Sequence, residues 1–312
     1  MLLSIIIPCY NEFGNVMPCY EGIAENVLPL KSKYDLDAEL IFVDDGSTDC
    51  TAAKLRELSL QDKRVKFIVF SRNFGKEAAI YAGLSYAAGD YIAIIDADLQ
   101  HPPSMISTMF EKLLDDRSLD CVAARRLSRE GEPVIRSTFA HLFYWLMSRI
   151  SDIKMQDGSG DFRIFTRKMA DSILSVKEYN RFSKGLFAWV GFKTGWVEYP
   201  YAERFSGSTK WSFLKLLKYS FEGITAYSTL PLAISSFSGL LFCFISIILA
   251  LYYALKALIY GEAVAGFPTL ICVILLVGGL QLFCMGILGE YLAKTYLETK
   301  NRPKFIITES NF

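Results

Sequence analysis

Histidine is scarce in this sequence, and the cysteines form no metal-binding motif. Two histidines occur among 312 residues, and no two of the seven cysteines are spaced as CxxC. A zinc site is therefore not expected, and any bound metal should be a hard cation held by oxygen atoms. The cysteines are expected to be reduced thiols that pack as small hydrophobic side chains.

The sequence also lacks an excess of charge of either sign. Lysine plus arginine and aspartate plus glutamate both total 33, so the formal net charge is +0. Without a global basic field, nucleic acid is not expected as a partner. A secretory leader is not expected either, because Met1–Ile7 carries no basic side chain and runs straight into a polar turn. This stretch is interpreted as a buried first strand, which leaves the amino-terminal domain in the cytoplasm.

The first half of the chain alternates short apolar runs with longer helical stretches. The runs of strand length are Leu3–Ile7, Leu40–Val43, Val65–Phe70, Tyr91–Ile95 and Cys121–Ala124. The helical stretches between them are Asn15–Leu28, Asp49–Leu60, Lys76–Ala88 and Pro103–Asp115. This alternation predicts an α/β fold with a mostly parallel, doubly wound sheet. Ligands bind beyond the carboxyl ends of the strands in such sheets, so the polar residues after each strand are the candidate functional residues.

The composition changes after about Lys210. No charged residue occurs from Gly223 to Leu255 or from Ala263 to Gly289. Each stretch exceeds the ~20 residues that a helix needs to cross a bilayer, so two transmembrane helices are predicted. Basic residues flank the pair, namely Lys210, Lys215 and Lys218 before it and Lys294, Lys300, Arg302 and Lys304 after it. Basic flanks stay inside, so a multi-pass protein of the inner or plasma membrane with both termini cytoplasmic is expected.

Two aromatic-rich stretches have the composition of helices that lie in the lipid headgroup plane. Phe139–Ile150 fits either that arrangement or core packing under the sheet, whereas Trp211–Tyr227 runs directly into a span and is interpreted as interfacial. The expected boundaries are 1–210 for the cytoplasmic α/β domain, 211–229 for the interfacial segment, 230–293 for the two transmembrane helices and 294–312 for a cytoplasmic tail.

Acidic clusters follow two of the predicted strands. Asp44-Asp45-Gly46-Ser47 comes after the second strand, and Asp96-Ala97-Asp98-Leu99-Gln100 comes after the fourth. An Asp-x-Asp turn places two carboxylates close enough to share one divalent cation. Mg²⁺ or Mn²⁺ held in this way can bridge a diphosphate and neutralise the charge that grows on it as a leaving group. Acidic turns are common, so it is the occurrence of both clusters that points to this chemistry.

Two further loops after strands carry candidate binding residues. Pro8-Cys9-Tyr10-Asn11-Glu12 offers a ring that could stack on a nucleobase and polar groups for a base or a ribose, although a loop with helix caps would look the same. Ser71–Lys76 opens a helix, and its Arg72 and Lys76 could face a phosphate at the helix N-terminus. Solvated basic side chains are the alternative interpretation.

These segments together resemble the family 2 glycosyltransferases of the GT-A fold, and in particular the branch that contains dolichyl-phosphate mannose synthases and bactoprenol glucosyltransferases. The resemblance rests on Pro8–Glu12, Asp44–Ser47, Ser71–Glu77 and Asp96–Gln100 with the following Pro102-Pro103. It continues through Gly158–Arg163, Asn180–Phe192 and Arg204–Trp211. With two trailing spans, the later segments are similar to the bactoprenol glucosyltransferases, and the resemblance covers almost the whole chain.

The resemblance implies a role for each matching residue. Pro8, Tyr10, Glu12 and Asp45 would hold the base and ribose, in a nucleotide-sugar site that also contains Asp44, Ser47, Arg72, Lys76 and Asp96. Asp96, Asp98 and Gln100 would bind the metal, and Asp98 would also be a catalytic residue. Asp161 would take the catalytic acidic position, with Arg163 beside it as a further catalytic residue. Arg204, Ser208 and Lys210 match the motif that binds a lipid phosphate.

The implied activity is the inverting transfer of a hexose to a polyisoprenyl phosphate such as undecaprenyl phosphate. UDP-glucose is the first choice of donor, with GDP-mannose, UDP-N-acetylglucosamine and UDP-aminoarabinose-type donors as alternatives. A phosphate monoester with a second pKa around 6 is already a nucleophile at neutral pH, so Asp161 is expected to orient the sugar and to stabilise positive charge rather than to act as a strong base. By analogy with the family, a homotetramer would suit the two-span anchor.

Three other functions agree less well with the sequence. A processive polysaccharide synthase would need a QxxRW motif, which this sequence lacks. A nucleotide-sugar-binding scaffold without turnover would have no need for the full set of catalytic and lipid-phosphate residues. A lipid flippase would need a path through the membrane, and two spans without a single interior charge leave little to line one.

Overall fold

The computed structural model describes residues 1–126, 149, 159–179, 181–199, 224–260 and 266–312. The chain divides into two compact units. Met1–Gly223 and Arg302–Phe312 make up an α/β unit, and Ile224–Asn301 makes up a helical unit. Each unit is described by itself. The predicted interfacial stretches Phe139–Ile150 and Trp211–Tyr227 fall almost entirely outside the described residues.

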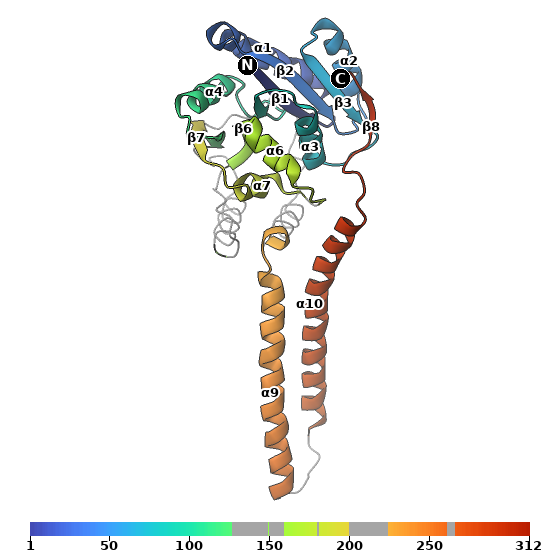
Figure 1. Cartoon of the computed structure of the whole chain (residues 1–312). Coiled ribbons are helices and arrows are strands. Elements are labelled where there is room, and N and C mark those ends of the chain that lie inside the picture. The colour runs from blue at the N-terminus through green and yellow to red at the C-terminus, as the bar shows by residue number, and fades with distance from the viewer. Residues whose placement is uncertain (127–148, 150–158, 180, 200–223, 261–265) are drawn as a thin grey trace. The chain divides into compact units, whose positions relative to one another are not determined.

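One eight-stranded sheet forms the centre of the α/β unit (Figure 1). Its strands are β1 (Leu2–Cys9), β2 (Asp37–Asp44), β3 (Val65–Phe70), β4 (Tyr91–Ile94), β5 (Cys121–Arg126), β6 (Ser159–Thr166), β7 (Thr194–Tyr199) and β8 (Ile307–Ser310). They lie in the order β7-β5-β6-β4-β1-β2-β3-β8. Neighbouring strands from β4 to β3 are parallel, as are β5 and β7, while β6 and β8 pair antiparallel with their neighbours. The predicted mostly parallel α/β sheet is confirmed.

Helices cover both faces of this sheet. On one face lie α1 (Phe13–Tyr34), α2 (Thr51–Gln61) and α4 (Met105–Asp115), which pack with the inward side chains of β1 and β2 in one hydrophobic core. On the other face lie α3 (Lys76–Tyr86), α6 (Arg167–Ser175) and α7 (Ser183–Trp189) in a second core. Burial on both faces explains why β1 is apolar almost throughout, since neither face of the strand meets water.

The register of the parallel strands brings their carboxyl ends to one edge. Cys9 at the end of β1 pairs with Asp44 of β2, and Asp44 pairs with Val69 of β3. On the other side of β1, Ile6 pairs with Ile94 at the end of β4. The four polar loops that the sequence singled out therefore start from adjacent positions on the same edge of the sheet.

Three strands were not predicted, and two of them matter for the site. β6 carries Asp161 and lies antiparallel to β4, where Arg163 pairs with Ile94. β8 comes from the last residues of the chain and pairs with β3, which would otherwise be the edge strand. The apolar run that marks other strands is interrupted in β6 by Asp161 and Arg163 and is absent from β8, so neither gave a strand signal.

The helical unit contains α9 (Leu230–Tyr260) and α10 (Phe267–Thr299). Both are long and apolar enough to cross a membrane: Leu230–Leu249 has a mean hydropathy of 2.3 and Leu276–Thr299 has one of 1.5. Large hydrophobic side chains are exposed along both helices, including Phe237, which is 72% exposed. In water such surfaces would be costly, so the two helices indicate membrane association.

Candidate active site

The loop after β2 is built around two buried carboxylates. Asp44 accepts hydrogen bonds from the backbone N–H of Ser47 at 3.0 Å and from its hydroxyl. Asp45 accepts from the N–H of Phe74 at 2.6 Å and from that of Gly75 at 2.9 Å, which ties this loop to the one after β3. Burial raises the pKa of the Asp45 carboxyl to about 6, although these two amide hydrogen bonds oppose the shift. Asp45 is therefore fixed in place by backbone donors.

Gly46 makes the close approach of these two loops possible. Its φ is +66°, and a Cβ at this position would collide with the backbone of Arg72. Only glycine fits both the left-handed conformation and the contact. The guanidinium of Arg72 lies 4.1 Å from the centroid of the Phe74 ring, on an exposed part of the loop. The structure thus places Arg72 at the site, stacked on a neighbouring ring.

The loop after β1 is fastened to the same region. The N–H of Asn11 donates to Ser47 Oγ at 2.8 Å, and Asn11 Oδ1 accepts from the N–H of Thr48 at 2.8 Å. The N–H of Glu12 donates to Thr51 Oγ1 at 3.0 Å. These bonds hold the predicted base-binding and ribose-binding residues around Asp44 and Asp45. Pro8 pairs with Val43, the residue before Asp44, and Tyr10 is half-buried between β1 and α1.

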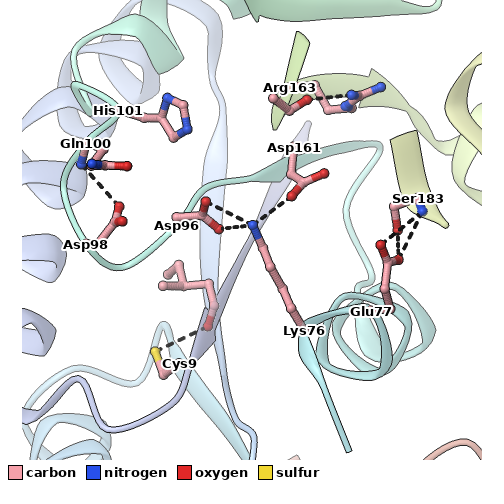
Figure 2. Close-up of polar contacts among 12 residues, drawn as sticks. Cys9, Lys76, Glu77, Asp96, Asp98, Gln100, His101, Asp161, Arg163 and Ser183 are labelled. Carbon is pink, nitrogen blue, oxygen red and sulfur yellow. Dashed lines mark hydrogen bonds and ion pairs between the residues drawn. The ribbon is translucent and has the colours of Figure 1, made fainter. Parts of the chain in front are cut away.

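Lys76 forms the centre of the site (Figure 2). At the start of α3, its Nζ lies 2.7 Å from Asp96 Oδ1 and 2.7 Å from Asp161 Oδ2. Burial of the ammonium opposes its charge, but Asp161 and Asp96 outweigh burial and raise the pKa of Lys76. Burial likewise opposes the charge of Asp161, and the ammonium of Lys76, followed by that of Lys184, outweighs it and lowers the pKa of Asp161. Three segments distant in the sequence thus meet in one ionised cluster.

The turn after β4 holds the predicted metal ligands. The N–H of Gln100 donates to Asp98 Oδ1 at 3.2 Å, and Leu99 between them has a φ of 57°. In Figure 2 Asp96 points toward Lys76, while Asp98 points toward Gln100. Across the described part of the chain, no three His, Cys, Asp or Glu side chains gather as a metal site. Two carboxylates and an amide are the oxygen donors that a hard divalent cation prefers, and the assignment of Asp96, Asp98 and Gln100 as metal ligands stays a prediction.

His101, the residue after Gln100, connects the same turn to β6 and β7. Its Nδ1 lies 2.8 Å from the hydroxyl of Tyr199 at the end of β7, and its ring packs against Phe162. Burial lowers the pKa of His101, so its neutral form is favoured. The sequence contained no signal for this contact, because His101 and Tyr199 are 98 residues apart in the chain.

Glu77 is a site residue to which the sequence had assigned no role. Its carboxylate accepts from the backbone N–H of Ser183 at 3.1 Å and from the Ser183 hydroxyl, and so caps the start of α7 from another helix. Burial, and after it the charge of Asp161, raises the pKa of Glu77. The contact fixes the segment that carries Lys184, whose charge acts on Asp161. The only available signal was the position of Glu77 inside the Ser71–Glu77 motif.

Arg163 lies in the core beside the site rather than at its centre. Its side chain donates to the carbonyl of Gly160 at 2.6 Å, and its guanidinium lies 3.7 Å from the centroid of the Phe187 ring. Its Nε has no hydrogen-bond partner among the described residues. The catalytic role predicted for Arg163 stays a prediction. Arg204, Ser208 and Lys210 lie outside the described residues, and their lipid-phosphate role stays a prediction as well.

Comparison with known proteins gives a consistent result. The model of the family "Glycosyl transferase family 2" matches residues 4–174. The "Prophage bactoprenol glucosyl transferase homolog" of Escherichia coli (strain K12) is 40% identical over 307 residues, covering 98% of each chain. The "SfII prophage-derived bactoprenol glucosyl transferase" of Shigella flexneri is 37% identical over 311 residues, covering 100% of this chain and 99% of the relative.

Among solved structures, the mannosyltransferase from Pyrobaculum calidifontis in complex with GDP-Man and Mn2+ is 15% identical, covers 93% of this chain and 86% of its own, and has a TM-score of 0.47. The family match spans the strands and loops that build the site, and the relatives match from end to end. The chain therefore belongs to glycosyl transferase family 2 and is a glycosyltransferase of the GT-A fold.

Proposed function

We propose that this protein transfers glucose from UDP-glucose to undecaprenyl phosphate, or a similar polyisoprenyl phosphate, at the cytoplasmic face of a membrane. The observation that carries the proposal is the end-to-end match, at 37–40% identity, to proteins named bactoprenol glucosyl transferase. The two apolar helices supply a reason for a lipid acceptor, since they would hold the enzyme where that acceptor resides.

The nucleotide would bind along the edge formed by the loops after β1, β2 and β3. Tyr10 is half-buried there, and backbone amides hold Asp45 in a fixed position; the two side chains would meet the base and the ribose. Asp44 keeps one carboxylate oxygen, Oδ2, without a hydrogen-bond partner among the described residues, although the side chain is fully buried. A buried acceptor of this kind is costly unless a ligand hydroxyl or amide donates to it.

Lys76 and the carboxylates around it would handle the charge of the reaction. The ammonium lies between Asp96 and Asp161 and would be close to a diphosphate bound at this edge, where it could offset the negative charge of the leaving group. Asp96, Asp98 and Gln100 would hold Mg²⁺ or Mn²⁺, which supplies further neutralisation of the diphosphate when bound.

Asp161 would face the sugar in its ionised form. Because Lys76 lowers its pKa, the carboxylate remains charged at neutral pH and can stabilise positive charge at the anomeric carbon. An acceptor phosphate oxygen forms the new bond to that carbon from the opposite face, the bond to the diphosphate breaks, and UDP leaves. The acceptor needs no strong base, since a phosphate monoester is largely ionised near pH 7.

The remaining parts of the proposal concern the lipid and the membrane. Arg204, Ser208 and Lys210 would bind the lipid phosphate just before the first span. Basic residues on the outer flanks of both spans support a cytoplasmic catalytic domain with both termini inside. A homotetramer would be compatible with the two-helix anchor.

A donor panel tests the proposal directly. Purified full-length protein would be incubated with undecaprenyl phosphate and radiolabelled UDP-glucose, UDP-N-acetylglucosamine, a UDP-aminoarabinose-type donor or GDP-mannose, and the lipid extract counted. Undecaprenol, which lacks the phosphate, is the matched control acceptor. Label from UDP-glucose in the phosphate lipid alone is the expected result. Preferential use of another donor would show that the transferred sugar is not glucose. Binding of nucleotide sugars without any labelled lipid would favour a nucleotide-sugar-binding scaffold without turnover.

A further inference from the structure

Residues 302–312 are part of the α/β unit, although they follow the helical unit in the sequence. Residues 304–311, here termed the C-terminal segment, include β8, which pairs antiparallel with β3. Asn311 extends the pairing, since its side chain accepts from the N–H of Phe67 at 2.7 Å and donates to the carbonyl of Val65 at 3.0 Å. Glu309 accepts from Arg56 Nε at 2.7 Å and Nη2 at 2.6 Å. Backbone and side-chain bonds along its whole length thus hold the segment in register.

At its start, the C-terminal segment contacts the loop after β3. The carbonyl of Ile306 accepts from the N–H of Ser71 at 2.9 Å. The ring of Phe305 stacks on Phe70, with centroids 5.0 Å apart and an interplanar angle of 11°. Phe70 in turn meets Phe74 edge-to-face at 5.8 Å, and the N–H of Phe74 donates to Asp45. A continuous set of contacts therefore leads from Phe305 to a carboxylate of the nucleotide site.

The same segment contacts α3, the helix that begins with Lys76. Tyr81 on this helix packs against Phe305, with centroids 6.3 Å apart. The ammonium of Lys304 lies 4.0 Å from the centroid of the Tyr81 ring, and the guanidinium of Arg181 lies 4.6 Å from it. Arg181 belongs to the segment that precedes α7. Phe305 thus contacts Phe70, which precedes the loop that holds Asp45. Both Phe305 and Lys304 contact Tyr81 on α3, the helix that begins with Lys76.

We propose that Phe305 is a positioning residue, which holds the loop 71–75 and the start of α3 in the conformation that binds the sugar nucleotide. The inference rests on the proposed function, because it assumes that this loop meets the donor. A loop that follows an edge strand has a neighbour on one side only, and β8 with Phe305 supplies the missing one. Without that support, the amides of Phe74 and Gly75 would no longer keep Asp45 in place. The sugar nucleotide would then have to order them on binding, which lowers its affinity.

Phe305→Ala in the full-length chain tests the assignment, with Phe312→Ala as the matched control. Phe312 directly follows the other end of the segment, is 47% exposed and packs only on Tyr86 among the described aromatic rings. Loss of an aromatic contact worth about 0.5–1.5 kcal/mol corresponds to about 2- to 12-fold in affinity. We expect Phe305→Ala to raise the Kd for UDP and the KM for the sugar nucleotide by that factor, with the KM for lipid phosphate unchanged. Phe312→Ala should change neither.

Amide hydrogen exchange gives a readout independent of turnover. In Phe305→Ala the amides of Phe74 and Gly75 should exchange faster than in wild type, and saturating UDP should restore part of their protection. Phe305→Tyr keeps the flat ring and should restore the wild-type Kd, which guards against a variant that merely folds poorly. Unchanged UDP affinity and exchange in Phe305→Ala, with wild type binding UDP, would overturn this inference alone. Failure of wild type to bind UDP would overturn the proposed function together with it.

Discussion

Replacing Lys76 with methionine would test the charge cluster at the centre of the site. The substitution keeps most of the side-chain volume and removes the ammonium that lies 2.7 Å from both Asp96 and Asp161. Breaking a buried ion pair costs about 3–5 kcal/mol and an exposed pair about 0–1 kcal/mol. Since 43% of the Lys76 side chain is exposed and 14% of that of Asp161, an intermediate loss of about 1–3 kcal/mol is expected.

The pH dependence of that loss identifies its origin. In wild type the pKa of Asp161 is lowered, so the stabilisation is fully present above the ordinary aspartate pKa and is lost only as pH falls through the lowered value. Lys76→Met removes the largest contribution that opposes the burial of Asp161 and leaves the charges of Lys184 and Arg163, so the pKa of Asp161 should rise. The stability deficit of the variant should therefore shrink as pH is lowered from 7 to 5, because the unpaired carboxyl takes up a proton.

Thermal unfolding at the two pH values measures the deficit, and Lys76→Arg, which retains the charge, is the control. In an Asp161→Asn background the deficit should also be smaller, since one of the two carboxylates has already been neutralised. Turnover by Lys76→Met should fall by about 10²–10³-fold, the cost of losing one electrostatic contact to the transition state. A deficit that is the same at pH 5 and pH 7, and the same in both backgrounds, would refute this account of the cluster.

Three further predictions concern the reaction itself. Asp161→Asn should lower kcat by less than the ~10²–10⁴-fold of a missing general base; a larger loss that is recovered at high pH would indicate proton abstraction instead. Arg204→Ala should raise the KM for lipid phosphate more than that for sugar nucleotide, and equal increases would count against its assignment. Chelation should abolish transfer and added Mg²⁺ or Mn²⁺ restore it, and Asp98→Asn should raise the concentration of cation needed; if the requirement is unchanged in that variant, Asp98 is not a ligand.

The parallel core of the sheet could be predicted from the sequence because β1 to β4 are apolar on both faces. Their carboxyl ends carried the polar loops, so the grouping of Asp45, Lys76 and Asp96 followed from the general geometry of parallel sheets. The antiparallel strands could not be predicted in this way. In β6 the charged Asp161 and Arg163 interrupt the apolar residues, which resembles a loop as much as a strand.

Individual partners in the site were less predictable than its location. Lys76 was expected to face phosphate, and its double ion pair depends on Asp161, which only the family resemblance had placed in the site. Glu77 was missed because an acidic residue in the first turn of a helix is already explained by the helix dipole. Its contact with Ser183 joins residues that are far apart in the chain, and no local pattern records such a pair.

The pairing of β8 with β3 has a consequence for biosynthesis. The strand β8, which pairs with β3, is synthesised after the sequence of both apolar helices. Until α9 and α10 have been synthesised, β3 is therefore an unpaired edge strand. Such a strand favours association with other chains. A shortened protein that ends before α9 would keep that edge open permanently. A water-soluble enzyme would be better obtained by deleting the helical unit and joining the two parts of the α/β unit, which end at residue 223 and begin at residue 302, through a flexible linker.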